Sequence, residues 1–426
     1  MQDICLISLP KPHLKQPEAQ ANLGLMYIAA YARLFKKSVS IDDFATDTDD
    51  EAVQKLPKAI IYGISITSLE VLHANRFAKK IKERFNHARV ILGGPGTLAR
   101  DFIDFNYIDS IVLGDGELTI LEVLRDAQNN MMQTIYEGKT VTDINTLPLP
   151  ARDLLKGPQG GNIFAYNKKY SDSDSTIIIS SRGCVHNCSF CSAKNLCNRR
   201  IRFRSPESVA DEIRHVKNNY GITQFRFSDD MATASRKRTF ELCNAIGPEN
   251  VFWRISCRVK PLDDDMCKAL IDAGCVELSF GIESFDQDVL NMLQKGTTVK
   301  DNVNALELAH KYGFSTRILM MIRTPGQTKQ TVEKNKYWLK RVPFSIIACT
   351  GLIPLPGTDI FDKPDNYNIE ILDKGLDKYN FYFYGPSGRR PLDKIFKIKD
   401  RDIDEFHQES EDFRDFIEDL GKVNRG

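Results

Sequence analysis

The stretch Thr176-IIISSRGCVHNCSFC-Ser192 decides how the rest of this chain is interpreted. Residues 176–179 favour extended backbone and predict a buried strand, and 180–183 predict the turn that ends it. Three cysteines then follow at CxxxCxxC spacing on one short loop: Cys184, Cys188 and Cys191. Three thiolates this close repel one another unless they bind a cation or a cluster.

Three ligands at such short range suit one face of a cubane [4Fe-4S] cluster and leave the fourth iron without a protein ligand. A structural zinc site normally uses four ligands in two pairs. The sequence contains no second CxxC pair. The motif therefore predicts an iron–sulfur cluster whose open iron is a place for chemistry.

Length and composition narrow the remaining choices. A chain of 426 residues allows two or three domains. The 58 Lys and Arg residues balance 57 Asp and Glu residues, so we expect no basic field for nucleic acid. Ten dilute cysteines, no signal-peptide pattern at Met1 and no apolar run of membrane-spanning length predict reduced thiols in a cytoplasmic protein without a membrane partner.

Residues 1–140 alternate short apolar runs with amphipathic helical stretches. This alternation predicts a doubly wound, Rossmann-like parallel sheet. The expected strands are 4–10, 39–45, 59–68, 90–95 and 110–115, and the expected helices are 21–36 and 71–86.

Ligands of such sheets bind beyond the carboxyl ends of the strands. Thr67, Ser68, Gly93 and Gly94 stand there, and the second glycine-rich turn covers 114–117. Glycine lets a ligand approach the backbone closely, and hydroxyls can bind a polar group. Ordinary strand-to-helix turns are an equally open interpretation.

Residues 141–175 form a linker rich in proline, glycine and short polar residues. Residues 176–360 repeat a strand–helix unit six times, which predicts a partial (β/α)6 barrel with its working face at the carboxyl ends of the strands. Residues 361–426 form a C-terminal extension that ends in a charged helix, which we expect to close the barrel. The expected barrel strands are 176–180, 224–229, 251–259, 276–284, 315–323 and 345–354. The apolar stripe of the last helix is Ile403, Phe406, Phe413, Phe416 and Ile417.

Polar residues follow most strands of this predicted barrel. Any one of these residues on its own could be a rim residue in a salt bridge. A polar group at the end of most strands, however, indicates a functional site. Beside the cysteine loop they are Asp229, Asp230, Arg258, Lys260, Glu283, Ser284 and Arg323.

The loop Arg182-GCVHNCSFC-Ser192 resembles the signature of the radical S-adenosylmethionine (radical SAM) superfamily, with Phe190 at the aromatic position before the third cysteine. The resemblance continues along the barrel and covers about residues 1–365. It includes Asp229-Asp230, Gly281-IE-Ser284, Thr324-Pro325-Gly326 and Pro354-LPG-Thr358. The N-terminal GGP at 93–95, the GDGE at 114–117 and Leu147-PLPARDL-Leu155 extend it to the cobalamin-binding branch.

The resemblance implies that Cys184, Cys188 and Cys191 hold a [4Fe-4S] cluster. S-adenosylmethionine would then chelate the open iron, and its reductive cleavage would give a 5′-deoxyadenosyl radical that takes hydrogen from the substrate. The cofactor-binding residues carried over are Phe190 in the loop, Asp229 and Asp230 for the methionine amino group, Glu283 and Ser284 for the ribose, and Thr67, Ser68, Gly93 and Gly94 for the cobalamin tail.

Two positions depart from the family pattern. Arg323 replaces the first glycine of a Gly-Leu-Pro-Gly segment, where a guanidinium would pair with the S-adenosylmethionine carboxylate, with an anionic substrate or with an acidic neighbour. The cobalt-binding DxHxxG pattern is absent. His13 is interpreted as a solvated loop residue, so cobalamin would bind without a protein imidazole.

The first hypothesis is a cobalamin-dependent radical SAM enzyme that methylates an unactivated carbon of a small-molecule or peptide substrate. It would take electrons from a donor such as flavodoxin or ferredoxin. The alternative is a radical rearrangement or cyclisation enzyme without methyl transfer, with or without cobalamin. A methylthiotransferase would need a second cysteine trio in residues 1–140, where only Cys5 occurs. A non-catalytic iron–sulfur or zinc protein that senses redox state is the fourth hypothesis. Polar groups such as Asp229, Asp230 and Glu283 at the strand ends argue against it, because a sensor does not need them. No catalytic side chain is assigned from the sequence.

Cys197 lies six residues beyond Cys191 and would close the cluster if it were a fourth ligand. The flanking Asn195 and Asn198 predict an exposed loop, so we expect no role in iron binding. Cys197→Ala should therefore keep both iron content and S-adenosylmethionine cleavage, measured after anaerobic reconstitution. Loss of the cluster in this variant would contradict the three-ligand interpretation.

Overall fold

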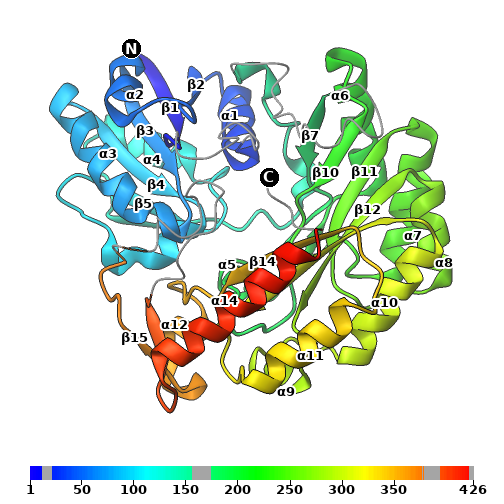
Figure 1. Ribbon diagram of the computed structural model, residues 1–426. Coiled ribbons are helices and arrows are strands. Elements are labelled where there is room, and N and C mark those ends of the chain that lie inside the picture. Colours follow the sequence, from blue (N-terminus) through cyan, green and yellow to red (C-terminus); the bar gives the residue numbers. More distant parts are fainter. Residues whose placement is uncertain (12–21, 156–173, 377, 379–393, 422–426) are drawn as a thin grey trace. The chain divides into compact units, whose positions relative to one another are not determined.

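The computed structural model describes residues 1–11, 22–155, 174–376, 378 and 394–421. The chain divides into two compact units, Met1–Ala165 with Gly375–Ser387, and Tyr166–Lys374 with Gly388–Gly426. Each unit contains a six-stranded parallel sheet (Figure 1). This confirms the predicted fold class. The predicted domain limits stay a prediction, because residues 156–173 of the linker lie outside the described residues, as do His13 and residues 379–393 of the C-terminal extension.

The sheet of the first unit has the order β2-β1-β3-β4-β5-β6. All five neighbouring pairs are parallel. The sequence did not predict β6 or the helices α2 and α4. The strands are β1 (Gln2–Ser8), β2 (Val39–Asp43), β3 (Ala59–Ser65), β4 (Arg89–Gly93), β5 (Ser110–Leu113) and β6 (Ile135–Glu137). The helices are α1 (Leu23–Leu34), α2 (Asp49–Lys55), α3 (Val71–Arg84) and α4 (Ile120–Gln128), with short 3₁₀ turns η1 (Ser68–Glu70), η2 (Pro95–Phe102), η3 (Ile144–Thr146) and η4 (Arg152–Leu154).

The sheet of the second unit has the order β14-β13-β12-β11-β10-β7. Its strands follow one another in chain order and are all parallel, as in part of a (β/α) barrel. The strands are β7 (Ser175–Ile178), β10 (Gln224–Phe227), β11 (Phe252–Cys257), β12 (Cys275–Glu283), β13 (Ser315–Ile322) and β14 (Ile346–Gly351). The helices that connect them are α5 (Ala193–Cys197), α6 (Pro206–Tyr220), α7 (Arg236–Ile246), α8 (Asp264–Asp272), α9 (Gln287–Met292), α10 (Val299–Lys311) and α11 (Lys329–Leu339), with the 3₁₀ turn η7 (Gly247–Glu249).

Smaller elements complete the second unit, and the sequence predicted only the last helix. The antiparallel pair β8 and β9 flanks the cysteine loop, and the pair β15 and β16 follows the sheet. Their bounds are β8 (Ser181–Arg182), β9 (Arg202–Phe203), α12 (Asp359–Asp362), η8 (Pro364–Tyr367), β15 (Ile369–Ile371), β16 (Phe396–Ile398) and α14 (Ile403–Asp419).

Successive side chains of a strand point to opposite faces of the sheet, and the helices pack on the face that carries the apolar ones. Phe225, Trp253, Leu278 and Ile318 share one buried cluster with apolar residues of the helices. The helix α6 shows how the sequence fixes one of them. It starts where Ser205 accepts a hydrogen bond from the Ser208 amide and ends where Gly221 has a φ of +67°.

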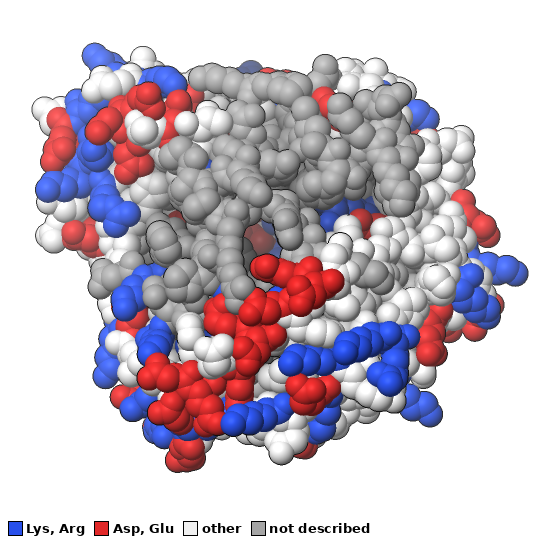
Figure 2. All heavy atoms as spheres, viewed as in Figure 1, with Lys and Arg blue, Asp and Glu red and all other residues white. Residues whose placement is uncertain are grey.

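The helix α14 packs into the same cluster through Phe413 and Ile417. Lys329 at the start of α11 forms an ion pair of 2.5 Å with Glu405, so α14 lies against a helix of the outer layer. Ile403 and Phe416 of the predicted stripe are only half-buried. Figure 2 shows acidic side chains gathered where Figure 1 places α14, with basic side chains near α11. None of the helices in the described ranges combines the length and the apolar character needed to cross a lipid bilayer.

A buried ion pair between Arg204 and Glu212 ties β9 to α6, and both side chains are almost fully buried. We expect Arg204→Met to lower the free energy of unfolding of this unit by about 3–5 kcal/mol, because it leaves a buried carboxylate without its guanidinium partner. Urea unfolding followed by tryptophan fluorescence measures this unit, since Trp253 and Trp338 are the two tryptophans of the chain.

The matched control is Lys237→Met, which removes the exposed partner of Glu241 on α7. It should change the same quantity by no more than the ~1 kcal/mol of an exposed pair. Equal effects of the two substitutions would contradict the role given to Arg204.

Candidate functional site

The cysteine loop runs from β8 to α5 and is held at its start by two neighbouring carboxylates. Asp229, just beyond β10, accepts hydrogen bonds from the Ser180 amide at 2.7 Å and from the hydroxyls of Ser180 and Ser181 at 2.5 and 2.7 Å. Asp230 accepts one from the Gly183 amide at 2.9 Å. Burial raises the pKa of Asp229, against the effect of its three hydrogen bonds. The end of one strand thus fixes the backbone that leads into Cys184.

Gly183 is the residue that lets the loop turn. It has a φ of +101°, and a Cβ there would lie 2.1 Å from the Arg200 carbonyl oxygen. Cys197 lies against the same turn: its Sγ accepts from the Cys184 amide and donates to the Cys184 carbonyl, both at 3.3 Å. The prediction of an exposed loop at Cys197 was wrong, because this residue ends α5 and is half-buried.

The surroundings of the three thiols fit an iron–sulfur cluster. Burial raises the pKa of Cys184 and of Cys191, while the backbone amides of His186 and Ala193 hydrogen-bond to these two sulfurs and act in the opposite direction. Arg258 Nη1 donates to Cys188 Sγ at 3.4 Å. Sulfurs that are removed from water and surrounded by N–H donors are typical of cluster ligands, whose charge the iron neutralises.

The described residues contain no group of three Cys, His, Asp or Glu side chains that converges on a single metal ion. Ligands of a cubane bind three separate irons and stand further apart than ligands of one ion. The assignment of Cys184, Cys188 and Cys191 as ligands of a cluster therefore stays a prediction.

A buried ion pair lies beside this loop. Lys295 Nζ is 2.7 Å from Glu283 Oε1, and both side chains are at most 10% exposed. The Lys295 ammonium is also 5.9 Å from the Phe190 ring centroid. Arg258 donates through Nη2 to the Lys295 carbonyl, which joins Cys188 to the pair. Lys295 was missed in the sequence, because only the folded chain brings its loop to the end of β12.

Glu283 owes its position to an irregularity of its strand. The register between β12 and β13 shifts between Gly281 and Glu283, and Glu283 has a φ of +59°. A Cβ at Gly281 would lie 2.7 Å from both Glu283 Oε1 and Lys295 Nζ. Bulges and left-handed non-glycine residues concentrate where a side chain is re-aimed for function. This local strain supports a functional role for Glu283.

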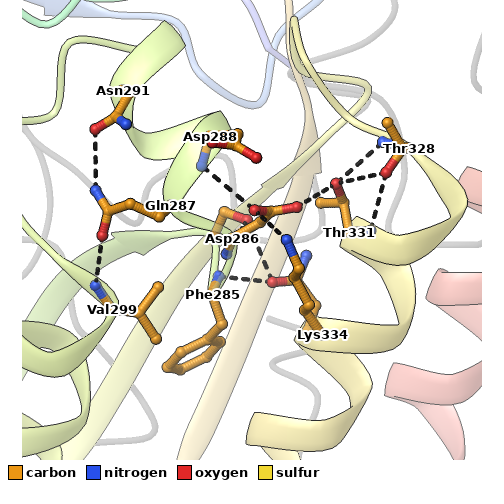
Figure 3. A network of polar contacts seen from close by, with 11 residues as sticks. Phe285, Asp286, Gln287, Asp288, Asn291, Val299, Thr328, Thr331 and Lys334 are labelled. Carbon is orange, nitrogen blue, oxygen red and sulfur yellow. Dashed lines mark hydrogen bonds and ion pairs between the residues drawn. The ribbon is translucent and has the colours of Figure 1, made fainter.

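The chain after Glu283 is fixed by a polar network (Figure 3). Ser284 donates to Asn335 at 3.2 Å and accepts from the Asp286 amide at 3.1 Å. Asp286 accepts from Thr331 at 2.6 Å and from Lys334 at 2.8 Å, both on α11. Ser284 therefore has partners within the fold, and its contact with a ribose stays a prediction.

Two further predicted rim residues also have structural partners. Arg323 is buried with a φ of +60°, stacks on Phe396 of β16 at 5.0 Å and donates to its carbonyl at 3.4 Å. The aromatic ring and carbonyl of Phe396 are thus two partners of Arg323 within the fold. Lys260 is exposed and pairs with Asp301 at 2.7 Å.

The predicted cobalamin contacts lie in the first unit, and they differ in kind. The Thr67 amide and hydroxyl both donate to Glu70 at 2.8 Å, which caps η1, and Ser68 is buried in that turn. Gly94 has a φ of +88°, and a Cβ there would lie 2.8 Å from the Ile66 carbonyl. A Cβ at Gly93 would meet no described atom within 4 Å. Gly93 alone leaves open space at the end of its strand.

Five of the remaining cysteines are buried in the apolar interior. Cys5, Cys243, Cys257, Cys267 and Cys275 are buried, and Cys349 is half-buried. Burial raises the pKa of Cys243 and of Cys267 to about 12, so these thiols stay protonated.

The chain is similar to known proteins over most of its length. Residues 178–336 match the family model described as the radical SAM superfamily. The chain is 28% identical over 403 residues to an uncharacterized methyltransferase of Pyrococcus horikoshii, covering 88% of this chain and 83% of that one. It is 25% identical over 380 residues to the anaerobic magnesium-protoporphyrin IX monomethyl ester cyclase of Rubrivivax gelatinosus, covering 83% and 68%.

Among solved structures, the radical S-adenosylmethionine methyltransferase TsrM of Kitasatospora setae, with cobalamin and a [4Fe-4S] cluster bound, superimposes with a TM-score of 0.72. The sequences are 15% identical, and the match covers 99% of this chain and 93% of TsrM. The similarity shows that the two chains share a fold.

The buried ion pair between Glu283 and Lys295 can be tested by removing its positive partner. Lys295→Met should lower the free energy of unfolding by about 3–5 kcal/mol and reduce the iron retained after anaerobic reconstitution, because it leaves the Glu283 carboxylate buried beside the loop. The double variant Lys295→Met with Glu283→Gln removes that charge and should recover most of the stability.

The control is Lys300→Met, at an exposed position of α10 in the same region of the chain. It should leave both quantities unchanged. A double variant that is less stable than Lys295→Met would show that the pair is not coupled.

Proposed function

We propose that this chain, whose residues 178–336 match the model of the radical SAM superfamily, is a cobalamin-dependent enzyme that methylates an unactivated carbon of a small-molecule or peptide substrate. The observation that carries the proposal is the cysteine loop, in which Cys188 is buried, Cys184 and Cys191 are half-buried, and backbone amides and Arg258 donate to the sulfurs. An electron donor such as flavodoxin or ferredoxin would reduce the cluster.

When bound, the reduced cluster and S-adenosylmethionine supply a 5′-deoxyadenosyl radical, and cobalamin supplies the methyl group. The residues of the chain position these groups and tune them. The Arg258 guanidinium places a positive charge beside the Cys188 sulfur. This charge would stabilise the reduced, more negative state of a cluster bound there. The Lys295 ammonium lies over the ring of Phe190, the residue before the third cysteine, and would help to hold that ring in place.

We assign different tasks to the carboxylates at the strand ends. Asp229 is fully engaged with Ser180 and Ser181, so we propose that it positions the loop. Asp230 has an additional oxygen beyond its bond to Gly183 and is the better candidate for the methionine amino group. Glu283, presented by the bulge of β12, is the candidate for the ribose hydroxyls, with Ser284 holding the turn that follows.

The first unit would bind cobalamin without an imidazole ligand to cobalt. Gly93 supports this proposal, because its strand end has room for a ligand to approach the backbone. Gly94, Thr67 and Ser68 would shape the turn around that space. A methyltransferase relative over most of the chain supports methyl transfer.

The second candidate is a radical cyclisation or rearrangement without methyl transfer. It is supported by the similarity to the cyclase of Rubrivivax gelatinosus, which is lower in identity and covers less of the relative.

Anaerobic reconstitution tests the proposal. The full chain, loaded with iron, sulfide and cobalamin, should bind about four iron atoms per chain. It should release 5′-deoxyadenosine when S-adenosylmethionine and a reductant are added. Cys188→Ala should abolish both, because it removes one of the three cluster ligands, while Cys349→Ala on β14 should change neither.

Iron binding without 5′-deoxyadenosine in the presence of reductant and candidate substrates would contradict the radical function. Release of 5′-deoxyadenosine with no binding of cobalamin at micromolar concentration would favour the second candidate.

A further inference from the structure

The turn that follows the cysteine loop carries four closely spaced arginines, and they are of two kinds. Arg204 is buried in its ion pair with Glu212, and Arg202 is half-buried and has a partner within the chain. Arg199 and Arg200 are exposed. In the part of the chain that the structure describes, neither of these two guanidinium groups has an ion-pair or hydrogen-bond partner. Their charges therefore face the solvent or a partner molecule.

The backbone holds both exposed arginines on an ordered turn. The helix α5 ends at Asn198, whose φ is +48°, and Arg199 follows with a φ of +55°. Left-handed residues other than glycine are uncommon, and such strain concentrates at functional sites. The amides of Arg199 and Arg200 donate to the carbonyls of Lys194 and Cys197 at 3.3 and 3.0 Å. Two adjacent charges are thus presented by a turn that the fold fixes from within.

This turn lies directly against the cysteine loop. A Cβ on Gly183 would lie 2.1 Å from the Arg200 carbonyl oxygen, so the two backbones are in close contact. The Cys197 sulfur hydrogen-bonds to the amide and the carbonyl of Cys184, both at 3.3 Å. Short contacts therefore connect the turn to the first of the predicted cluster ligands. Because electron transfer between proteins weakens steeply with distance, a donor bound at this turn would be well placed to reduce a cluster on the loop.

An apolar side chain within the cysteine loop completes this surface. Val185 follows Cys184 in the chain and is 52% exposed, whereas Cys188 in the same loop is buried. Weak electron-transfer complexes use small interfaces, in which charged residues orient the partner. We call Val185, Arg199 and Arg200 the donor face.

The local charge of the donor face decides which partner it attracts, because the chain as a whole is almost neutral. Its formal charge is +1, from 58 basic and 57 acidic residues. The field of the whole chain would therefore contribute little to steering a partner. Guanidinium groups bind carboxylates through paired N–H donors, so an acidic protein surface fits. A polynucleotide would need a longer row of basic residues to contact its phosphates.

We propose that the donor face docks an acidic flavodoxin that reduces the cluster. Carboxylates around the flavin would pair with Arg199 and Arg200, and the apolar edge of the flavin ring would face Val185. The anionic flavin hydroquinone gives one electron to the [4Fe-4S]²⁺ cluster, which becomes [4Fe-4S]¹⁺. The flavin becomes a neutral semiquinone, and no proton is transferred. This assignment rests on the proposed function and deepens it by naming the partner of that site.

Binding is measured without turnover. The full chain, after anaerobic reconstitution, is titrated with oxidised flavodoxin by isothermal calorimetry. We expect one-to-one binding that weakens as the salt concentration rises from about 0.05 to 0.5 M, because salt screens exposed charges. Arg199→Glu with Arg200→Glu should weaken it about 10-fold or more, since two attractions become repulsions. Arg199→Lys with Arg200→Lys keeps both charges and should bind nearly as tightly as wild type.

The matched control reverses two lysines of the outer helices, with Lys268→Glu on α8 and Lys340→Glu at the end of α11. Both positions are exposed, and the net charge changes by the same amount as in the arginine variant. The control should bind flavodoxin as wild type does. Urea unfolding by tryptophan fluorescence verifies that each variant is folded. Equal weakening in the control and in the arginine variant would reveal an effect of net charge alone and overturn the docking surface.

A small chemical reductant separates docking from catalysis. With titanium(III) citrate, the variant Arg199→Glu with Arg200→Glu should release 5′-deoxyadenosine as fast as wild type. With reduced flavodoxin below saturation, its rate should fall about 10-fold, as its affinity does.

Equal rates of the variant and wild type with flavodoxin overturn the proposal. No binding of flavodoxin, with or without binding of a ferredoxin, also overturns it. If neither chain releases 5′-deoxyadenosine with either reductant, the proposed function fails instead, and calorimetry still decides whether the donor face docks flavodoxin.

Discussion

The hydrogen bonds from Ser180, Ser181 and Gly183 to Asp229 and Asp230 are the constraint on which the site depends. They join the turn after β7 to the end of β10, its neighbour in the sheet. A loop with three thiols has many conformations of similar energy, and these buried bonds select one of them. The cost of burying Asp229 is offset by three donors, so the carboxylate stabilises the turn only while that geometry is kept.

A second chain of contacts extends from this loop across the sheet. Arg258 joins Cys188 to the Lys295 carbonyl, and Lys295 joins Phe190 to Glu283. The loop, the end of β11 and the end of β12 are thus coupled by buried charges. Burying a charge without a partner costs free energy, so these side chains favour the one arrangement in which each charge has its partner. It also places one positive group beside a sulfur and one carboxylate at the neighbouring strand end.

The inner face of the second sheet is unusual for a partial barrel. The layers inside such barrels are mostly filled by branched apolar side chains. Here the layer below the strand ends carries Arg226, Arg254, Arg317 and Glu277 around a cavity. The helix-covered face has the apolar core that the fold needs, with Phe225, Trp253 and Leu278 in it. The charged layer therefore contributes little to apolar burial.

The sequence by itself determined the cysteine loop and the two parallel sheets, because CxxxCxxC spacing and strand–helix alternation are local properties. The cap at Ser205 and the turn at Gly221 follow from the same local rules. It also indicated which strand ends carry polar groups. Only the tertiary structure decided what those groups contact: that Asp229 binds the loop backbone, that Arg323 stacks on Phe396, and that Cys197 lies against Cys184. Lys295 and the arginine layer became visible only there, because strand register brings together residues that no sequence spacing relates.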